Sequence, residues 1–171
     1  MARELLSLEE MKSLTRLFRD VFAYTESIKA QSGIAVHIQR PKVPTILTES
    51  LVVHLMKEED LIPEMKGFNL ERGGETQSDI CATGGKSVKA IEVKGTTADF
   101  IALGRKDLAA DYLIWLQYLS FFSKPYDPFV DLCIVEKPGR YFDESDAKMN
   151  LGEFKKRARG LIEKKIRLDW T

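Results

Sequence analysis

Hydrophobic residues recur at intervals of three and four along much of this chain, which is the pattern of helices with one buried face. The pattern predicts four helices, over residues 7–31, 44–59, 105–121 and 146–166. Ser7 suits the N-cap of the first helix because Glu10 follows three residues later, and Pro44 suits the first position of the second helix. The third helix is the clearest of the four, because leucine and aromatic residues recur in it at helical spacing.

Shorter stretches that alternate between hydrophobic and polar residues, or that are hydrophobic throughout, predict strands. They cover residues 34–38, 68–72, 77–97 and 129–136, and the third of these has the pattern of a tight hairpin. We therefore expect an α/β fold with a mixed sheet flanked by helices. We expect one domain over residues 1–171, with a helical N-terminal part (1–43), a core (44–136) and a C-terminal helix (146–166).

The hairpin brings two acidic residues and a lysine to one face. Gly85 and Lys86 suit the central positions of a type II′ turn, because the first of these positions requires a positive φ. In that register the numbers of paired residues sum to 171, so Asp79 lies opposite Glu92. Side chains alternate along a strand, so Lys94 shares the face of Glu92.

A turn at Gly84 and Gly85 would instead place Asp79 opposite Ala90. Glu92 would then be the diagonal neighbour of Asp79, about 7 Å away on the same face. Both registers therefore bring the two carboxylates together. The other face of the hairpin is apolar, and we expect it to pack in the core.

Two carboxylates on neighbouring strands repel each other unless a cation lies between them. Mg²⁺ takes one or two carboxylates together with waters and a phosphate oxygen, so Asp79 and Glu92 are candidate metal ligands. The backbone carbonyl of Val93 is a candidate third ligand, and Lys94 can orient a water or stabilise charge on a phosphate. The alternative is a solvated acid pair. The chain has six acid–x–lysine triplets, but only this one lies in a predicted strand with an acid opposite.

Composition places few limits on the function. The chain carries 26 basic and 26 acidic residues, and this even balance argues neither for nor against nucleic-acid binding. A basic stretch over residues 155–167 fits either a solvated helix face or a surface that faces DNA. The two cysteines predict reduced thiols, and no zinc spacing is present.

No apolar run reaches the length of a membrane-spanning helix, and the first residues lack the apolar stretch of a signal peptide. We therefore expect a cytoplasmic protein without a membrane partner.

The hairpin residues, together with the later segment LGRKDLAADYLIWL, resemble the PD-(D/E)xK nuclease superfamily and are most similar to its type II restriction endonucleases. The resemblance covers about residues 44–136, and Ser78 stands where the superfamily usually has proline. It implies an αβββαβ core in which Asp79, Glu92 and Lys94 are the catalytic residues. It also implies hydrolysis of DNA that depends on Mg²⁺, with Mn²⁺ able to substitute, and that leaves a 5′-phosphate and a 3′-hydroxyl.

Four further residues are candidates for the site. Many such nucleases add an acid from the helix before the sheet, and Glu49 is the candidate for this metal ligand. Gln77 lies on the acidic face two residues before Asp79 and is a candidate contact to DNA. Arg105 and Lys106 open a predicted helix, where two cations and a helix N-terminus suit a DNA phosphate. Each of these residues has a surface, capping or solubility role as its alternative.

The resemblance implies an enzyme that cuts double-stranded DNA at a specific sequence. We expect a homodimer, because one chain carries one site and cleavage of a duplex needs two, or else one subunit of a heterodimeric nuclease. Two other functions stay open. One is a structure-specific nuclease, such as a Holliday junction resolvase or a repair nuclease. The other is a nuclease-fold DNA-binding subunit of a larger complex.

Overall fold

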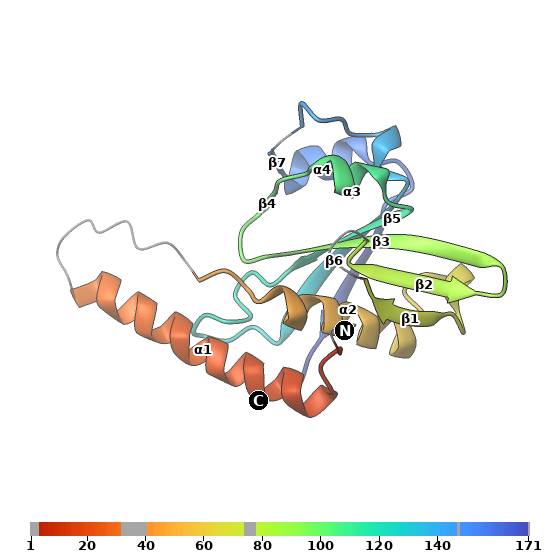
Figure 1. The fold of residues 1–171 in the computed structure, drawn as a ribbon. Helices are drawn as coiled ribbons and strands as arrows, with labels where there is room; N and C mark the ends of the chain where they lie inside the picture. The colour runs from red at the N-terminus through yellow and green to blue at the C-terminus, as the bar shows by residue number, and fades with distance from the viewer. Residues whose placement is uncertain (1–3, 32–40, 74–77, 147, 171) are drawn as a thin grey trace.

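A six-stranded mixed sheet forms the centre of the computed structural model, which describes residues 4–31, 41–73, 78–146 and 148–170 (Figure 1). Within these residues the strand order is β1 (Asn69–Arg72), β2 (Ile80–Gly84), β3 (Ser87–Thr96), β5 (Tyr112–Gln117), β6 (Phe129–Glu136) and β8 (Ile162–Arg167). A second, two-stranded sheet consists of β4 (Phe100–Ile101) and β7 (Met149–Asn150).

Helices lie on both faces of the large sheet, which confirms the predicted α/β class. α1 (Leu8–Gln31) and α2 (Thr45–Glu58) cover one face, and α3 (Arg105–Ala109) and α4 (Leu151–Arg157) lie on the other beside β4 and β7 (Figure 1). Short 3-10 helices, η1 (Pro63–Met65) and η2 (Pro138–Arg140), lie between strands. α1 and α2 begin and end within one residue of the sequence prediction. No helix in the described parts of the chain combines the length and hydrophobicity that a membrane crossing requires.

The connection between β3 and β5 positions the site. β1, β2 and β3 are antiparallel neighbours, whereas β3 and β5 are parallel, so the chain between them crosses one face of the sheet. This crossover contains β4 and α3. Lys94 on β3 pairs in register with Trp115 on β5, and Trp115 packs in the core on the α3 and α4 side. α3 therefore lies over the face that carries Lys94.

The hairpin has the register that its turn predicted. Gly84 pairs with Ser87 and Ile80 pairs with Ile91, so the pairs sum to 171, and Gly85 has a φ of 59°. The predicted core face of the hairpin is buried, with Ile80 fully covered, as are Ala82 and Ile91. The prediction of one packed face and one acidic face is confirmed.

The prediction of a helix over residues 105–121 is wrong. α3 ends at Ala109, and residues 112–117 form β5, which lies between β3 and β6. Every residue of β5 is buried. A strand that is covered on both faces is hydrophobic throughout, so it lacks the alternation that separates a strand from a helix.

The prediction of a C-terminal helix over residues 146–166 is also wrong. α4 ends at Arg157, and residues 162–167 form β8, which pairs with β6 at the edge of the sheet. Ala158 caps α4 with an extended backbone, and Gly160 in the turn that follows has a φ of 72°, a conformation that favours glycine. The predicted strand over residues 34–38 lies outside the described residues.

Close packing fixes α2 against β3 beside the site. A Cβ atom at Gly95 on β3 would lie only 2.5 Å from Oγ1 of Thr48 on α2, so glycine allows the helix to approach the strand. Thr48 is buried and its hydroxyl lies 3.0 Å from the hydroxyl of Tyr118, with which it shares a hydrogen bond. These contacts therefore fix the distance between the first turn of α2 and β3.

Candidate functional site

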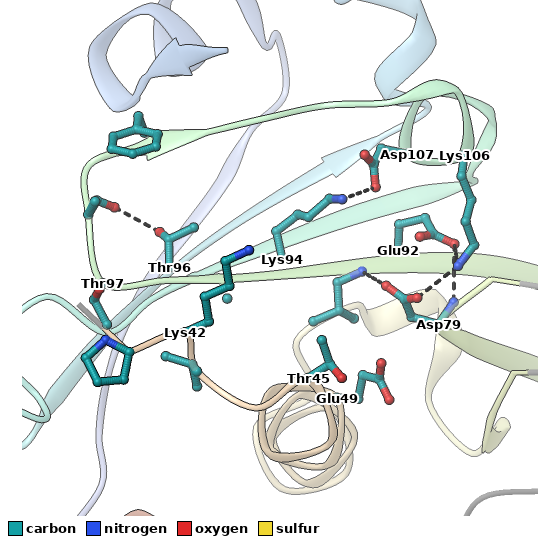
Figure 2. Close-up of a pocket in the computed structure, with 16 residues that line it drawn as sticks. Lys42, Thr45, Glu49, Asp79, Glu92, Lys94, Thr96, Thr97, Lys106 and Asp107 are labelled. Carbon is teal, nitrogen blue, oxygen red and sulfur yellow. Dashed lines mark hydrogen bonds and ion pairs between the residues drawn. The ribbon is translucent and has the colours of Figure 1, made fainter. Parts of the chain in front are cut away.

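The hairpin holds two carboxylates against each other where β2 begins. Asp79 directly precedes β2, and Glu92 lies in β3 (Figure 2). Asp79 Oδ2 accepts the N–H of Val93 at 2.9 Å, and Glu92 Oε1 accepts the N–H of Asp79 at 3.2 Å. Each carboxylate therefore bonds to the backbone of the opposite segment. These crossed hydrogen bonds fix the acid pair, by which we mean Asp79 and Glu92, without a third side chain.

The environment of the acid pair favours a cation. Glu92 is buried, with 2% of its surface exposed. Burial raises the pKa of its carboxyl, and the neighbouring charge of Asp79 raises it further, to about 7, although the bonds to Lys106 and to the Asp79 N–H act in the opposite direction. A positive charge beside both acids offsets their repulsion and part of the cost of burial.

Lys106 supplies such a charge from α3. Its Nζ lies 2.9 Å from Asp79 Oδ1 and 3.2 Å from Glu92 Oε1, so one ammonium bridges both acids (Figure 2). Burial lowers the pKa of this ammonium, but the bonds and charges of the two acids together raise it above its ordinary value. The structure thus places Lys106 on the carboxylates, and its predicted contact with DNA stays a prediction.

Lys94 is held by a different acid. Its Nζ lies 2.9 Å from Oδ1 of Asp107 on α3 (Figure 2). Asp107 is buried, with 3% of its surface exposed, and its Oδ2 also accepts the N–H of Gly104 at 2.7 Å. About a third of the Lys94 side chain is exposed. Asp107 is therefore anchored on one side and orients the Lys94 ammonium on the other.

An open pocket of about 670 Å³ adjoins all of these groups. The acid pair, Lys94, Lys106 and Asp107 line one part of it, and the rest is lined by residues 41–43, Thr45, Glu49, Val93, residues 95–98 and Phe100. Lys42 extends into the pocket from the segment before α2 (Figure 2). No carboxylate of the described residues lies within ion-pair distance of Lys42. Three ammonium groups and several hydroxyl groups around one open pocket suit a phosphate-bearing ligand.

The remaining predicted site residues have separate positions. Glu49 lines the same pocket from α2, is buried and forms an ion pair with Arg72 of β1. Burial raises the pKa of Glu49, although the bond and charge of Arg72 lower it, and its role as a metal ligand stays a prediction. Arg105 lies outside the lining of the pocket and pairs with Glu144 at 2.8 Å. Gln77 lies outside the described residues.

The donor set fits Mg²⁺ with substrate better than a metal centre made by protein alone. Within the described residues, no three histidine, cysteine, aspartate or glutamate side chains are grouped so that they could hold a metal ion. The acid pair offers two carboxylates, and Mg²⁺ typically keeps its waters and takes one or two carboxylates plus substrate phosphates. The bridging ammonium of Lys106 acts here as a stand-in cation, which shows that the carboxylate oxygens converge on one position.

Sequence reasoning missed two residues of the pocket. Asp107 carried a signal, because it lies three residues after Gly104 at the start of a helix, which is the spacing of a capping acid. Lys42 carried none, because it lies in an irregular segment without a motif. Both enter the pocket through tertiary contacts that spacing along the chain does not predict.

Comparisons with known protein families, with curated proteins and with solved structures found no match to this chain.

Proposed function

We propose that this chain is a Mg²⁺-dependent DNA endonuclease of the PD-(D/E)xK type, most similar to the type II restriction endonucleases. The observation that carries the proposal is the crossed acid pair with the ammonium groups of Lys94 and Lys106 at one open pocket. Hydrolysis of a phosphodiester needs a polarised phosphate, an activated water and positive charge near the transition state. Asp79 and Glu92 can hold the metal ion that polarises the phosphate and activates the water, and Lys94 and Lys106 supply positive charge.

The order of elements supports the assignment to this superfamily. From α2 the chain continues through β1, β2, β3, the short strand β4, α3 and β5, and without β4 this is the order of the αβββαβ core that the motif implies. The first acid directly precedes the second strand, and the second acid and the lysine lie in the third strand. The motif residues and the elements that carry them therefore agree with one assignment.

The chain's own residues have distinct roles in the proposed reaction. Asp79 and Glu92 would hold the metal ion, with the carbonyl of Val93 as a further ligand. When bound, Mg²⁺ supplies a Lewis acid for the phosphate and lowers the pKa of a coordinated water, and Mn²⁺ supplies the same chemistry. Lys94 stabilises the negative charge that builds on the phosphate and orients the attacking water. Asp107 is a positioning residue, because it acts through Lys94.

The substrate we propose is double-stranded DNA, cut at a specific sequence by a homodimer. One chain contributes one acid pair, and cutting both strands requires two. The even charge balance of the chain favours this class over a structure-specific nuclease, which usually carries a larger excess of basic residues to bind the DNA backbone. Lys42 is placed to contact a backbone phosphate from the far side of the pocket.

The test is incubation of plasmid, linear duplex and four-way junction DNA with the purified protein and millimolar Mg²⁺. We expect discrete fragments with 5′-phosphate ends, and we expect Asp79→Ala and Lys94→Ala to lower the rate at least about 100-fold. Lys86→Ala, at the exposed tip of the hairpin, is the matched control and should cut like the wild type. Cleavage of the junction alone would instead support a structure-specific nuclease. A wild type that cuts none of the three substrates with Mg²⁺ or Mn²⁺ would refute the proposal.

A further inference from the structure

We propose that Lys106 is a resident counter-ion of the acid pair, which a divalent cation displaces when it binds. The inference rests on the proposed function, since it concerns the same metal position. It adds a residue outside the acid–acid–lysine motif and assigns that residue to the control of metal loading. The motif lysine, Lys94, has a different partner and a different role.

The contacts of the two lysines distinguish them. The ammonium of Lys106 contacts one oxygen of each acid, at 2.9 and 3.2 Å. The ammonium of Lys94 contacts Asp107 at 2.9 Å, and neither member of the acid pair lies within ion-pair distance of it. Of the two lysines, Lys106 is therefore the one that neutralises the carboxylates that the metal ion would use.

A divalent cation and the Lys106 ammonium would compete for the same oxygens of Asp79 and Glu92. Asp79 Oδ2 and Glu92 Oε1 already accept backbone N–H groups, and Glu92 Oε1 also accepts the Lys106 ammonium. Asp79 Oδ1 is bonded to Lys106 as well. A cation that bridges the pair uses the position between these oxygens, so it and the ammonium exclude each other.

Displacement of Lys106 is physically feasible. About half of the Lys106 side chain is exposed, and it reaches the acids through a flexible four-carbon stem from the first turn of α3. The ammonium can therefore leave the carboxylates without unfolding any element. It lines the pocket already, so after displacement it stays available to a phosphate in that pocket.

The experiment measures metal binding rather than cleavage. Titration calorimetry with Mn²⁺ in the absence of DNA compares the wild type with Lys106→Met, which keeps the apolar stem and removes the charge. We expect Lys106→Met to bind Mn²⁺ about tenfold more tightly, since removing two contacts of a partly exposed ammonium changes an equilibrium by about that factor. Lys106→Met should also melt at a lower temperature than the wild type in EDTA, because the acid pair then lacks a counter-ion.

Two matched variants test the position of the charge. Lys94→Met removes a charge from the same pocket but not from the acid pair, so its Mn²⁺ affinity should stay within about twofold of the wild type. Lys106→Arg keeps the charge and can bridge two carboxylates with its planar fork, so it should weaken Mn²⁺ binding. The Arg variant also keeps the inference testable if Lys106→Met does not fold.

The outcomes separate this inference from the proposed function. If the wild type cuts DNA but Lys106→Met binds Mn²⁺ no more tightly than the wild type, the inference fails alone. If neither protein binds Mn²⁺ or Mg²⁺ at millimolar concentration, the inference fails, and the proposed function fails with it when the wild type also cuts no DNA. If only Lys106→Met binds the ion, Lys106 is a counter-ion strong enough to exclude the metal, and the inference holds.

Discussion

Replacing Glu92 with glutamine should change how the stability of the metal-free protein depends on pH. Burial and the charge of Asp79 raise the pKa of Glu92 from its ordinary 4.5 to about 7 in the folded protein. The folded state therefore binds a proton that the unfolded state has already lost at intermediate pH. The free energy of unfolding should fall as the pH rises from about 4.5 to 7, and Glu92→Gln should remove that part of the dependence.

The size of this change in the free energy of unfolding follows from the same pKa values. Each tenfold change in proton affinity corresponds to about 1.4 kcal/mol, so the change in the pKa of Glu92 from 4.5 to about 7 amounts to about 3–4 kcal/mol at most. The side chain of Glu92 is only 3% exposed, so solvent screens this effect little. Above pH 7 the ionised carboxylate persists in the fold at that cost, which the proposed metal ion would offset.

The assay is urea unfolding in EDTA at several pH values between 4 and 8. We expect Glu92→Gln to become more stable relative to the wild type as the pH rises, with most of the change between pH 4.5 and 7. Glu71→Gln changes an exposed acid on β1, which β2 separates from β3, and it should keep the wild-type dependence. A stability difference between Glu92→Gln and the wild type that stays constant across this range would show that the reasoning is wrong.

Three further predictions concern the same region. Asp107→Asn should lower the cleavage rate at least about tenfold, because it removes the charged partner of Lys94. The melting temperature measured by calorimetry should change little, since asparagine can still accept the Gly104 N–H. Gly95→Ala should destabilise the protein by about 1–3 kcal/mol in urea unfolding, because the new Cβ would lie 2.5 Å from Oγ1 of Thr48. Adding Thr48→Ala to the same chain should recover part of the lost stability. Mg²⁺ at tenfold its dissociation constant should raise the free energy of unfolding by about 1.4 kcal/mol over EDTA, and an unchanged melting temperature would contradict a specific site.

The sequence predicts the hairpin and its acid pair because both depend on local rules. A glycine with positive φ at the first turn position selects the register, and the period of two then assigns every side chain to a face. The long helix α1 is predicted equally well, because its buried residues repeat at helical spacing. α2 is buried around most of its surface, so Pro44 at its start, rather than one buried face, marks it in the sequence. Local periodicity is sufficient wherever an element is covered on one side only.

The elements that the sequence does not predict are those whose surroundings override their pattern. β5 is buried on both faces, so Tyr112 and Leu116 share helical spacing only by coincidence. β8 is an edge strand with two adjacent lysines, and its charges have the pattern of a solvated helix unless Gly160 is read as a turn between α4 and β8. Because the crossover before β5 is set by parallel pairing, the positions of Lys106 and Asp107 beside the acids do not follow from spacing.

The two halves of the pocket depend on contacts of different range along the chain. The acid pair depends on a hairpin of local contacts, whereas Lys106 and Asp107 lie in the crossover that the parallel pairing of β3 with β5 holds over the sheet. A chain with the hairpin formed but β5 unpaired would therefore present its carboxylates without the lysine and aspartate that balance and align them. For the proposed hydrolysis, activity would then require completion of the whole sheet, and an incompletely folded copy would be a poor hydrolase rather than an indiscriminate one.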